Sequence, residues 1–228
     1  MKVKSLKRTT HDAGRKTRIG ILGGTFNPVH NGHLKIAEAA QKKLGLEKVI
    51  FVPCARPPHK TGERLPPPAD RYEMTRIAVK GSAGFSISDS EIRRKGKSYT
   101  IDTVRAFRKA DPGSEYCFII GADTLLEIPT WREYRKLLKE CRFVVVNRPG
   151  FQNVPKGSFR AKCPKGIHSD KMSRRDPLGQ SAKLTMIKIP GTEVSSSEIR
   201  KRVKAGRSIK TLVPSCVEKY ITEKGLYK

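Results

Sequence analysis

The stretch G-G-T-F-N-P-V-H-N-G-H, residues 23–33, lies between two patterns that predict regular structure. An apolar run at 18–22 precedes it and predicts a buried strand. Apolar residues at helical spacing follow it over 34–44, and 49–52 is a second apolar run. Strand, glycine turn, helix and strand form a βαβ unit, which requires two parallel strands and a right-handed crossover.

The alternation of strand and helix patterns continues along the chain. Further strands are predicted at 85–88, 116–120, 142–146 and 184–189, and further helices at 70–80, 100–109, from 130, at 195–206 and at 215–225. Capping-box spacing at Thr130, Ser195 and Ser215 places three of the helix starts. The pattern predicts an α/β fold: a doubly wound, Rossmann-like parallel sheet of about five strands with helices on both faces.

Charge is strongly and unevenly distributed. The chain has 228 residues, 48 of them Lys or Arg and 21 Asp or Glu, for a formal net charge of +27. Residues 1–18 hold seven basic residues and one acid, and residues 152–183 hold eight and two. We expect a basic, disordered tail at 1–17 and a single domain over 18–228, with an irregular basic insertion at about 152–183. Such a charge attracts polyanions, nucleotides and nucleic acids alike.

The cysteines and the apolar runs bear on location. Five widely spaced cysteines without a C-x-x-C pair signal neither a disulfide framework nor a zinc knuckle. No run approaches the length of a membrane span, and the first residues lack the apolar stretch of a signal peptide. The expected location is the cytoplasm, although the acid-poor opening also leaves an organellar transit segment open.

Residues 23–33 have the chemistry of a phosphate site. Gly23 and Gly24 let the backbone turn and approach an anion closely, and the N-terminus of the following helix offers free N–H groups to it. His30 and His33 are three residues apart, so both lie on that side of the helix. Two such histidines are also compatible with a plain surface or with half a metal site. No carboxylate or cysteine lies at a spacing that would complete a zinc site, which favours phosphate.

These eleven residues resemble the G-G-x-F-D/N-P-x-H-x-G-H signature of the nucleotidyltransferase superfamily. Later motifs resemble, in order, those of the bacterial nicotinate-nucleotide adenylyltransferases. They are P-P-H-K (57–60), S-Y-T-I-D-T (98–103), I-G-A-D (120–123), Trp131, R-P-G (148–150) and V-S-S-S-E-I-R (194–200). The resemblance covers about residues 18–228 except the insertion. The last motif departs from I-S-S-T-x-I-R by Val194 and Ser197, and the second change keeps the hydroxyl.

The resemblance implies that His33 is the main catalytic residue and that His30, Lys60 and Arg200 act beside it on the phosphates. For Lys60, a solvated loop lysine is the alternative interpretation. Ser196, Ser197 and Arg200 would hold the β- and γ-phosphates, and Asp123 would accept ribose hydroxyls. The implied ATP site comprises Gly23, Gly24, Thr25, Phe26, His30, His33, Gly121, Asp123, Ser196, Ser197 and Arg200.

For the second substrate, the resemblance implies a pyridine mononucleotide site at Thr100, Trp131, Arg132 and Arg148. Trp131 would stack on the pyridine ring, and backbone N–H groups near Thr100 and Arg132 would meet its carboxylate.

The implied reaction is transfer of the adenylyl group of ATP to nicotinate mononucleotide in NAD biosynthesis, with release of pyrophosphate. It would proceed by direct in-line attack, with Mg²⁺ as cofactor, bridging phosphate oxygens and taking no ligand from a protein side chain.

Three alternatives stay open. Nicotinamide mononucleotide could be the preferred acceptor. Another nucleotidyltransferase, for example one acting on phosphopantetheine, is disfavoured by Trp131 and by the S-Y-T-I-D-T and G-A-D motifs. A basic nucleic-acid-binding protein that reuses the fold is disfavoured because clustered exposed aromatics for base stacking are not evident.

Overall fold

The computed structural model of the protein describes residues 16–58, 65–125, 127–147, 184–189 and 194–228. Apart from residues 16 and 17, the predicted tail at 1–17 and the predicted insertion at 152–183 lie outside these ranges.

A parallel sheet forms the centre of the fold. Its strands are β1 (Arg18–Gly24), β2 (Lys48–Pro53), β3 (Phe85–Ile87), β4 (Glu115–Gly121), β5 (Arg142–Asn147) and β6 (Leu184–Lys188). They lie in the order β3-β2-β1-β4-β5-β6, and every neighbouring pair is parallel. The predicted doubly wound sheet is confirmed, with six strands among the described residues where about five were expected.

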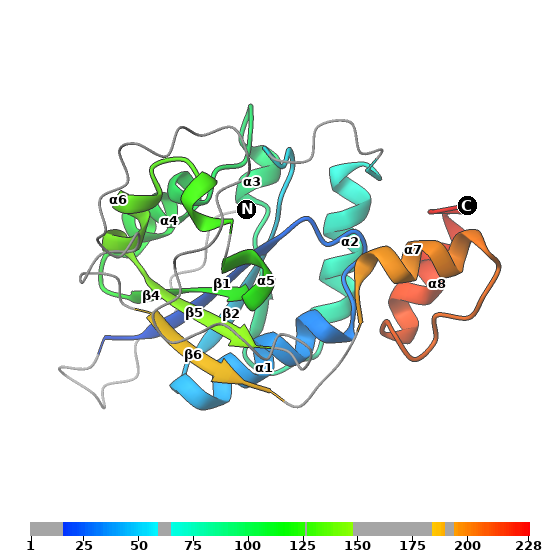
Figure 1. Cartoon of the computed structure of the whole chain (residues 1–228), viewed down its shortest axis with the longest axis horizontal. Helices are drawn as coiled ribbons and strands as arrows, with labels where there is room; N and C mark the ends of the chain where they lie inside the picture. Colours follow the sequence, from blue (N-terminus) through cyan, green and yellow to red (C-terminus); the bar gives the residue numbers. More distant parts are fainter. Residues whose placement is uncertain (1–15, 59–64, 126, 148–183, 190–193) are drawn as a thin grey trace, which may run out of the picture.

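Helices cover both faces of the sheet. They are α1 (Asn31–Leu44), α2 (Pro68–Val79), α3 (Ser90–Arg93), α4 (Thr100–Ala110), α5 (Ala122–Leu125), the 3₁₀ helix η1 (Ile128–Thr130), α6 (Tyr134–Glu140), α7 (Ser196–Lys204) and α8 (Ser215–Glu223). Figure 1 shows α4 and α6 on one side of the strands and α1 on the other, with α7 and α8 packed together beyond α2. No helix among the described residues is long and apolar enough to cross a membrane.

Each face of the sheet has its own hydrophobic core, because successive side chains of a strand point to opposite faces. In β1, Leu22 packs in the cluster that contains α1, α2 and α8, whereas Ile21 packs in the cluster under α4 and α6. Gly20 lies in the same strand where a Cβ would come within 2.8 Å of Ile119 Cδ1 and 2.9 Å of Leu46 Cδ1. Only glycine therefore fits between these side chains without repacking.

The predicted helix starts have different outcomes. Ser195 is the N-cap of α7, and its Oγ accepts a hydrogen bond of 3.1 Å from the Glu198 N–H, as predicted. The prediction at Thr130 is wrong: its hydroxyl donates to the Glu127 carbonyl within η1, and α6 begins only at Tyr134. The helix start predicted at Ser215 is confirmed, since α8 begins there, but Pro214 occupies the N-cap position and no side chain caps the helix.

Candidate active site

The candidate site lies where the strand order reverses. β1 is flanked by β2 and β4, so the connections after β1 and β4 leave the sheet in opposite directions. In doubly wound sheets this switch point opens a crevice at the carboxyl ends of the strands, where ligands bind. The loop from Gly24 to His30 follows β1, and Gly121 and α5 follow β4. Both implied nucleotide-binding segments therefore border the same crevice.

The turn after β1 is made by a phenylalanine and not by the glycines. Gly23 and Gly24 are still part of β1 and have ordinary negative φ, whereas Phe26 has φ 47°. The prediction that the glycines provide the turn is therefore wrong. Their role is spatial: a Cβ on Gly24 would come within 3.2 Å of the Phe26 ring, and one on Gly23 within 3.0 Å of Phe118 Cζ. Because neither glycine carries a side chain, the Phe26 ring packs beneath the loop, where it is 2% exposed.

The two histidines lie together at the start of α1. His30 is the N-cap residue and is 2% exposed, while His33 lies one turn further and is half-buried. Their ring centroids are 3.8 Å apart. The Phe26 and His33 rings meet edge-on, with their centroids 5.0 Å apart. The His30 backbone N–H donates to His33 Nδ1 at 3.3 Å. Because Nδ1 accepts, a neutral His33 carries its proton on Nε2, which leaves an N–H donor at the far end of the ring.

Side chains of helix α7 donate hydrogen bonds to the other side of the same loop. Ser196 Oγ donates to the Pro28 carbonyl at 3.0 Å, and Arg200 Nη1 donates to the Asn27 carbonyl at 2.9 Å. Arg200 Nη2 also reaches Ser197 Oγ at 3.4 Å. The predicted phosphate residues of α7 are thus brought to the H-x-G-H segment, although they are 168 to 173 residues away in sequence.

Trp131 ends η1 and packs on the strands beside the crevice. Its ring meets Phe118 of β4 edge-on at a centroid distance of 6.0 Å and meets Phe143 of β5 at 6.5 Å. The indole is half-buried, so one part of it packs on the core and another part stays accessible.

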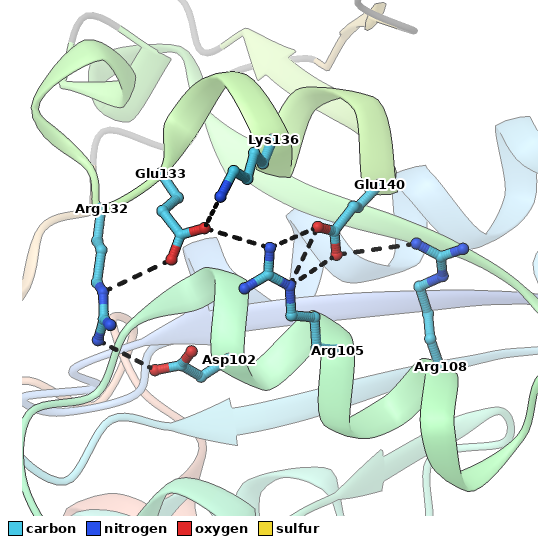
Figure 2. A network of polar contacts seen from close by, with 7 residues as sticks. All are labelled: Asp102, Arg105, Arg108, Arg132, Glu133, Lys136 and Glu140. Atoms are coloured by element: carbon cyan, nitrogen blue, oxygen red, sulfur yellow. Dashed lines mark hydrogen bonds and ion pairs between the residues drawn. The ribbon is translucent and has the colours of Figure 1, made fainter.

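A polar network holds residues 131–140, called here the Trp131 segment, against α4. Arg132 lies over the Tyr99 ring at 4.8 Å and 3.8 Å from Asp102, both at the start of α4. Figure 2 shows Arg105 of α4 between two carboxylates of the α6 segment: its Nη2 is 2.7 Å from Glu140 and 3.3 Å from Glu133. The network therefore holds Arg132 against the first turn of α4, which begins at Thr100.

A buried carboxyl group supports the first turns of α4 from behind. Glu91 of α3 is 6% exposed and accepts a 2.6 Å hydrogen bond from Thr103 Oγ1. Arg94 donates to the same hydroxyl at 3.2 Å. Burial raises the pKa of Glu91, and the hydrogen bond from Thr103 acts in the opposite direction. The orientation of α4 is therefore fixed by α3, a helix that the sequence patterns did not predict.

Some predicted site residues cannot be placed. Lys60 and Arg148 lie outside the described residues, and Asp123 is placed only as part of α5, without its side chain. Among the described residues, no group of three His, Cys, Asp or Glu side chains could hold a metal ion.

One residue of the site escaped the sequence interpretation. Arg71 of α2 is buried beside the loop that follows β1. A signal for it existed, because Arg71 shares one helix face with the buried Met74 and Ala78. A lone charged residue on an apolar face indicates a buried polar contact, since an unpartnered buried charge is very costly.

Comparisons with known proteins identify the family of the chain. The cytidylyltransferase-like family matches residues 21–202. A Moorella thermoacetica protein named as a probable nicotinate-nucleotide adenylyltransferase is 44% identical over 216 residues, which is 94% of this chain and 93% of the relative. A Geobacter metallireducens protein of the same name is 42% identical and covers 92% of this chain and 98% of the relative.

The fold also matches a solved structure, Plasmodium falciparum nicotinic acid mononucleotide adenylyltransferase complexed with NaAD. The TM-score is 0.73 at 21% identity, over 93% of this chain and 98% of that one. From the family match and the curated relatives together, the chain belongs to the cytidylyltransferase-like family and, within it, to the nicotinate-nucleotide adenylyltransferases.

Proposed function

We propose that this protein transfers the adenylyl group of ATP to the phosphate of nicotinate mononucleotide, which yields nicotinate adenine dinucleotide and pyrophosphate. The observation that supports this best is the convergence of His30, His33 and Arg200 on one loop at the switch point of the sheet. The name carried by relatives at 42–44% identity supports nicotinate mononucleotide as the acceptor.

The proposed chemistry is a direct displacement. A phosphate oxygen of the mononucleotide attacks the α-phosphorus of ATP in line, and the bond to the β-phosphate bridging oxygen breaks. The attacking phosphate is already ionised, so no general base is needed. His33 would donate its Nε2–H to the α-phosphate, and Arg200, whose guanidinium carries four Nη hydrogens, would contact the departing pyrophosphate. Rate then comes from alignment and from neutralised charge.

Magnesium would enter this site together with ATP. The described residues offer no cluster of three metal-ligating side chains, so phosphate oxygens and water would provide its ligands. Bound in that way, the ion neutralises negative charge on the triphosphate. His33 and Arg200 hold and orient the phosphates independently of it.

For the acceptor, we propose that the pyridine ring stacks on the accessible part of Trp131 and that its carboxylate meets N–H groups near Thr100 and Arg132. The network of Figure 2 supports this, because it ties the Trp131 segment to the start of α4. Lys60 over the phosphates, Asp123 on a ribose and Arg148 at the mononucleotide remain part of the proposal.

One assay tests the function directly. Purified protein with Mg-ATP is offered nicotinate mononucleotide or nicotinamide mononucleotide, and dinucleotide and pyrophosphate are quantified separately. We expect efficient adenylylation of the nicotinate form. Preference for the nicotinamide form would change the substrate, and failure with both would reject the function. Retention of RNA or DNA on a filter at physiological salt, without any dinucleotide formed, would favour the nucleic-acid-binding alternative.

The network gives a prediction about the acceptor alone. Replacement of Arg105 by methionine should raise the KM for the mononucleotide several-fold and leave the KM for ATP unchanged, because it removes the ion pairs that hold Glu133 and Glu140, which follow Trp131, against α4. Arg108→Met is the matched control, since the ion pair of Arg108 among the described residues is with Glu140, at 3.8 Å. Steady-state kinetics with each substrate varied in turn measures both constants. Equal changes in the two KM values would contradict a local effect.

We also propose a cytoplasmic location and a single nucleotidyltransferase domain over 18–228. The location is supported by Cys54, Cys117, Cys141 and Cys216, which are free thiols, as is usual in a reducing compartment.

A further inference from the structure

Arg71 is a buried guanidinium surrounded by backbone carbonyls. It lies on α2, is 1% exposed, and donates to four carbonyl oxygens that come from three different segments. The acceptors are the carbonyls of Thr25 at 2.8 Å, Cys54 at 2.5 Å, Ala55 at 3.0 Å and Pro66 at 3.2 Å. Four of its five N–H groups are therefore used, and they join the loop after β1 to the segment after β2.

The charge of this guanidinium has no ionised partner among the described residues. The two acidic groups that act on it electrostatically are the Cys54 thiol and the Tyr227 hydroxyl. Burial raises the pKa of Cys54 to about 11 and also raises the pKa of Tyr227, so both are neutral near pH 7. Among the described residues, only carbonyl dipoles therefore offset the cost of burying Arg71. Such an arrangement is costly, which argues for a function beyond packing.

The geometry of the peptide bond shows what Arg71 fixes. In a planar trans peptide, the C=O and the next N–H point in opposite directions. Two of the peptides whose carbonyls bind Arg71 show this. The Cys54 and Ala55 carbonyls point to Arg71. The N–H groups of the same two peptides, those of Ala55 and Arg56, donate to Ser98 Oγ at 3.2 and 3.4 Å.

The third peptide has no such acceptor. The Thr25 carbonyl points to Arg71, so the Phe26 N–H points away from it, and no described residue accepts a hydrogen bond from this N–H. Arg71 lies among carbonyls that follow β2, and β1 has β2 on one side and β4 on the other. We infer that the Phe26 N–H points away from β2, toward the β4 side of β1, where the proposed phosphate site lies.

We propose that Arg71 is a positioning residue for ATP: its planar fork fixes the Thr25 carbonyl and thereby aims the Phe26 N–H at a phosphate oxygen. Phe26, the residue whose N–H this peptide carries, has an unusual φ of 47°. The inference rests on the proposed function, because it assigns the ligand of this N–H to the triphosphate. Arg71 itself does not touch the substrate.

The test compares two variants with a matched control. Arg71→Lys keeps the positive charge but replaces the planar fork by a single ammonium group, and Arg71→Gln removes the charge and its desolvation cost. Arg76→Met is the control, since Arg76 is exposed on the same helix and, in the described part of the chain, pairs with Glu73 alone. Calorimetry measures the affinity for α,β-methylene-ATP and for nicotinate mononucleotide, and circular dichroism measures folding.

We expect both Arg71 variants to bind α,β-methylene-ATP about 10-fold more weakly and to show a kcat at least ~10-fold lower, since a misplaced contact of this kind costs up to about 10²-fold. Affinity for nicotinate mononucleotide and the properties of Arg76→Met should match the unsubstituted protein. This split between the two substrates separates positioning from a general loss of structure.

Three results would overturn the proposal. The first is an Arg71→Lys variant with normal ATP-analogue affinity and kcat, because the fork would then be unnecessary. The second is a parallel loss of affinity for both ligands. The third is failure of both variants to reach the native circular dichroism signal at low temperature, because Arg71 would then be a requirement of folding. If the unsubstituted protein binds the analogue but makes no dinucleotide, the proposed function fails while the affinity data still decide the role of Arg71.

Discussion

Replacement of His33 by alanine is expected to lower kcat at least ~100-fold, which is the usual effect of removing one donor to a charge-bearing oxygen in the transition state. The physical reason is the fixed tautomer. Nδ1 accepts from the His30 N–H, so the proton of a neutral ring lies on Nε2 and needs no reorganisation when charge develops on the α-phosphate. Steady-state kinetics with saturating Mg-ATP and nicotinate mononucleotide measures the loss.

Two further variants sharpen this result. His33→Gln keeps an N–H donor at a similar distance from the backbone and should retain more activity than the alanine variant. Lys35→Ala removes an exposed side chain from the same helix and should be active at the normal rate. A His33→Ala protein with near-normal kcat would refute the role of His33 and weaken the proposed mechanism as a whole.

Replacement of Gly32 by alanine is expected to reduce kcat about 10- to 100-fold, although alanine is the better helix former by about 1 kcal/mol. A Cβ at this position would come within 2.9 Å of His30 Nδ1 and 3.0 Å of His30 Cε1. The His30 ring is 2% exposed and stacks on His33 at 3.8 Å, so it can move only by displacing the second histidine. The glycine of H-x-G-H therefore leaves room for a histidine ring.

The measurement combines kcat with a thermal melt. We expect lower activity and a melting temperature that does not fall below that of the unsubstituted protein by more than a few degrees. Lys42→Ala provides an added alanine near the end of the same helix, far from the histidines, and should change neither quantity substantially. Unchanged kcat in Gly32→Ala would show that the ring pair tolerates displacement.

The long periodic elements were predictable from sequence because their apolar residues are buried as the pattern requires. The runs at 49–52 and 142–146 became β2 and β5, with five and four consecutive buried residues respectively. The short elements α3, α5 and η1 were missed, since three or four residues carry no periodicity. Their positions depend on the rest of the fold.

The turns that shape the site were also beyond sequence patterns. The phosphate loop turns at Phe26, and α6 is preceded by Glu133 with φ 52°, a conformation that local preference disfavours for both residues. Packing of the Phe26 ring under Gly24 and the ion pairs of Glu133 accompany these conformations. A motif therefore identifies which residues converge, whereas tertiary contacts decide which of them turns the chain.

The hydrogen bonds from α7 to the loop after β1 have a consequence for synthesis of the protein. Pro28 and Asn27 leave the ribosome 168 and 173 residues before the Ser196 and Arg200 side chains that hold their carbonyls. At translation rates of about 5–20 residues per second, the interval is roughly 10 to 30 s. Strands β1 to β5 can pair during that time, whereas the loop acquires its contacts from α7 only when the last segment of the chain emerges. A chain cut before α7 would therefore retain most of the sheet and lack the contacts that complete the loop.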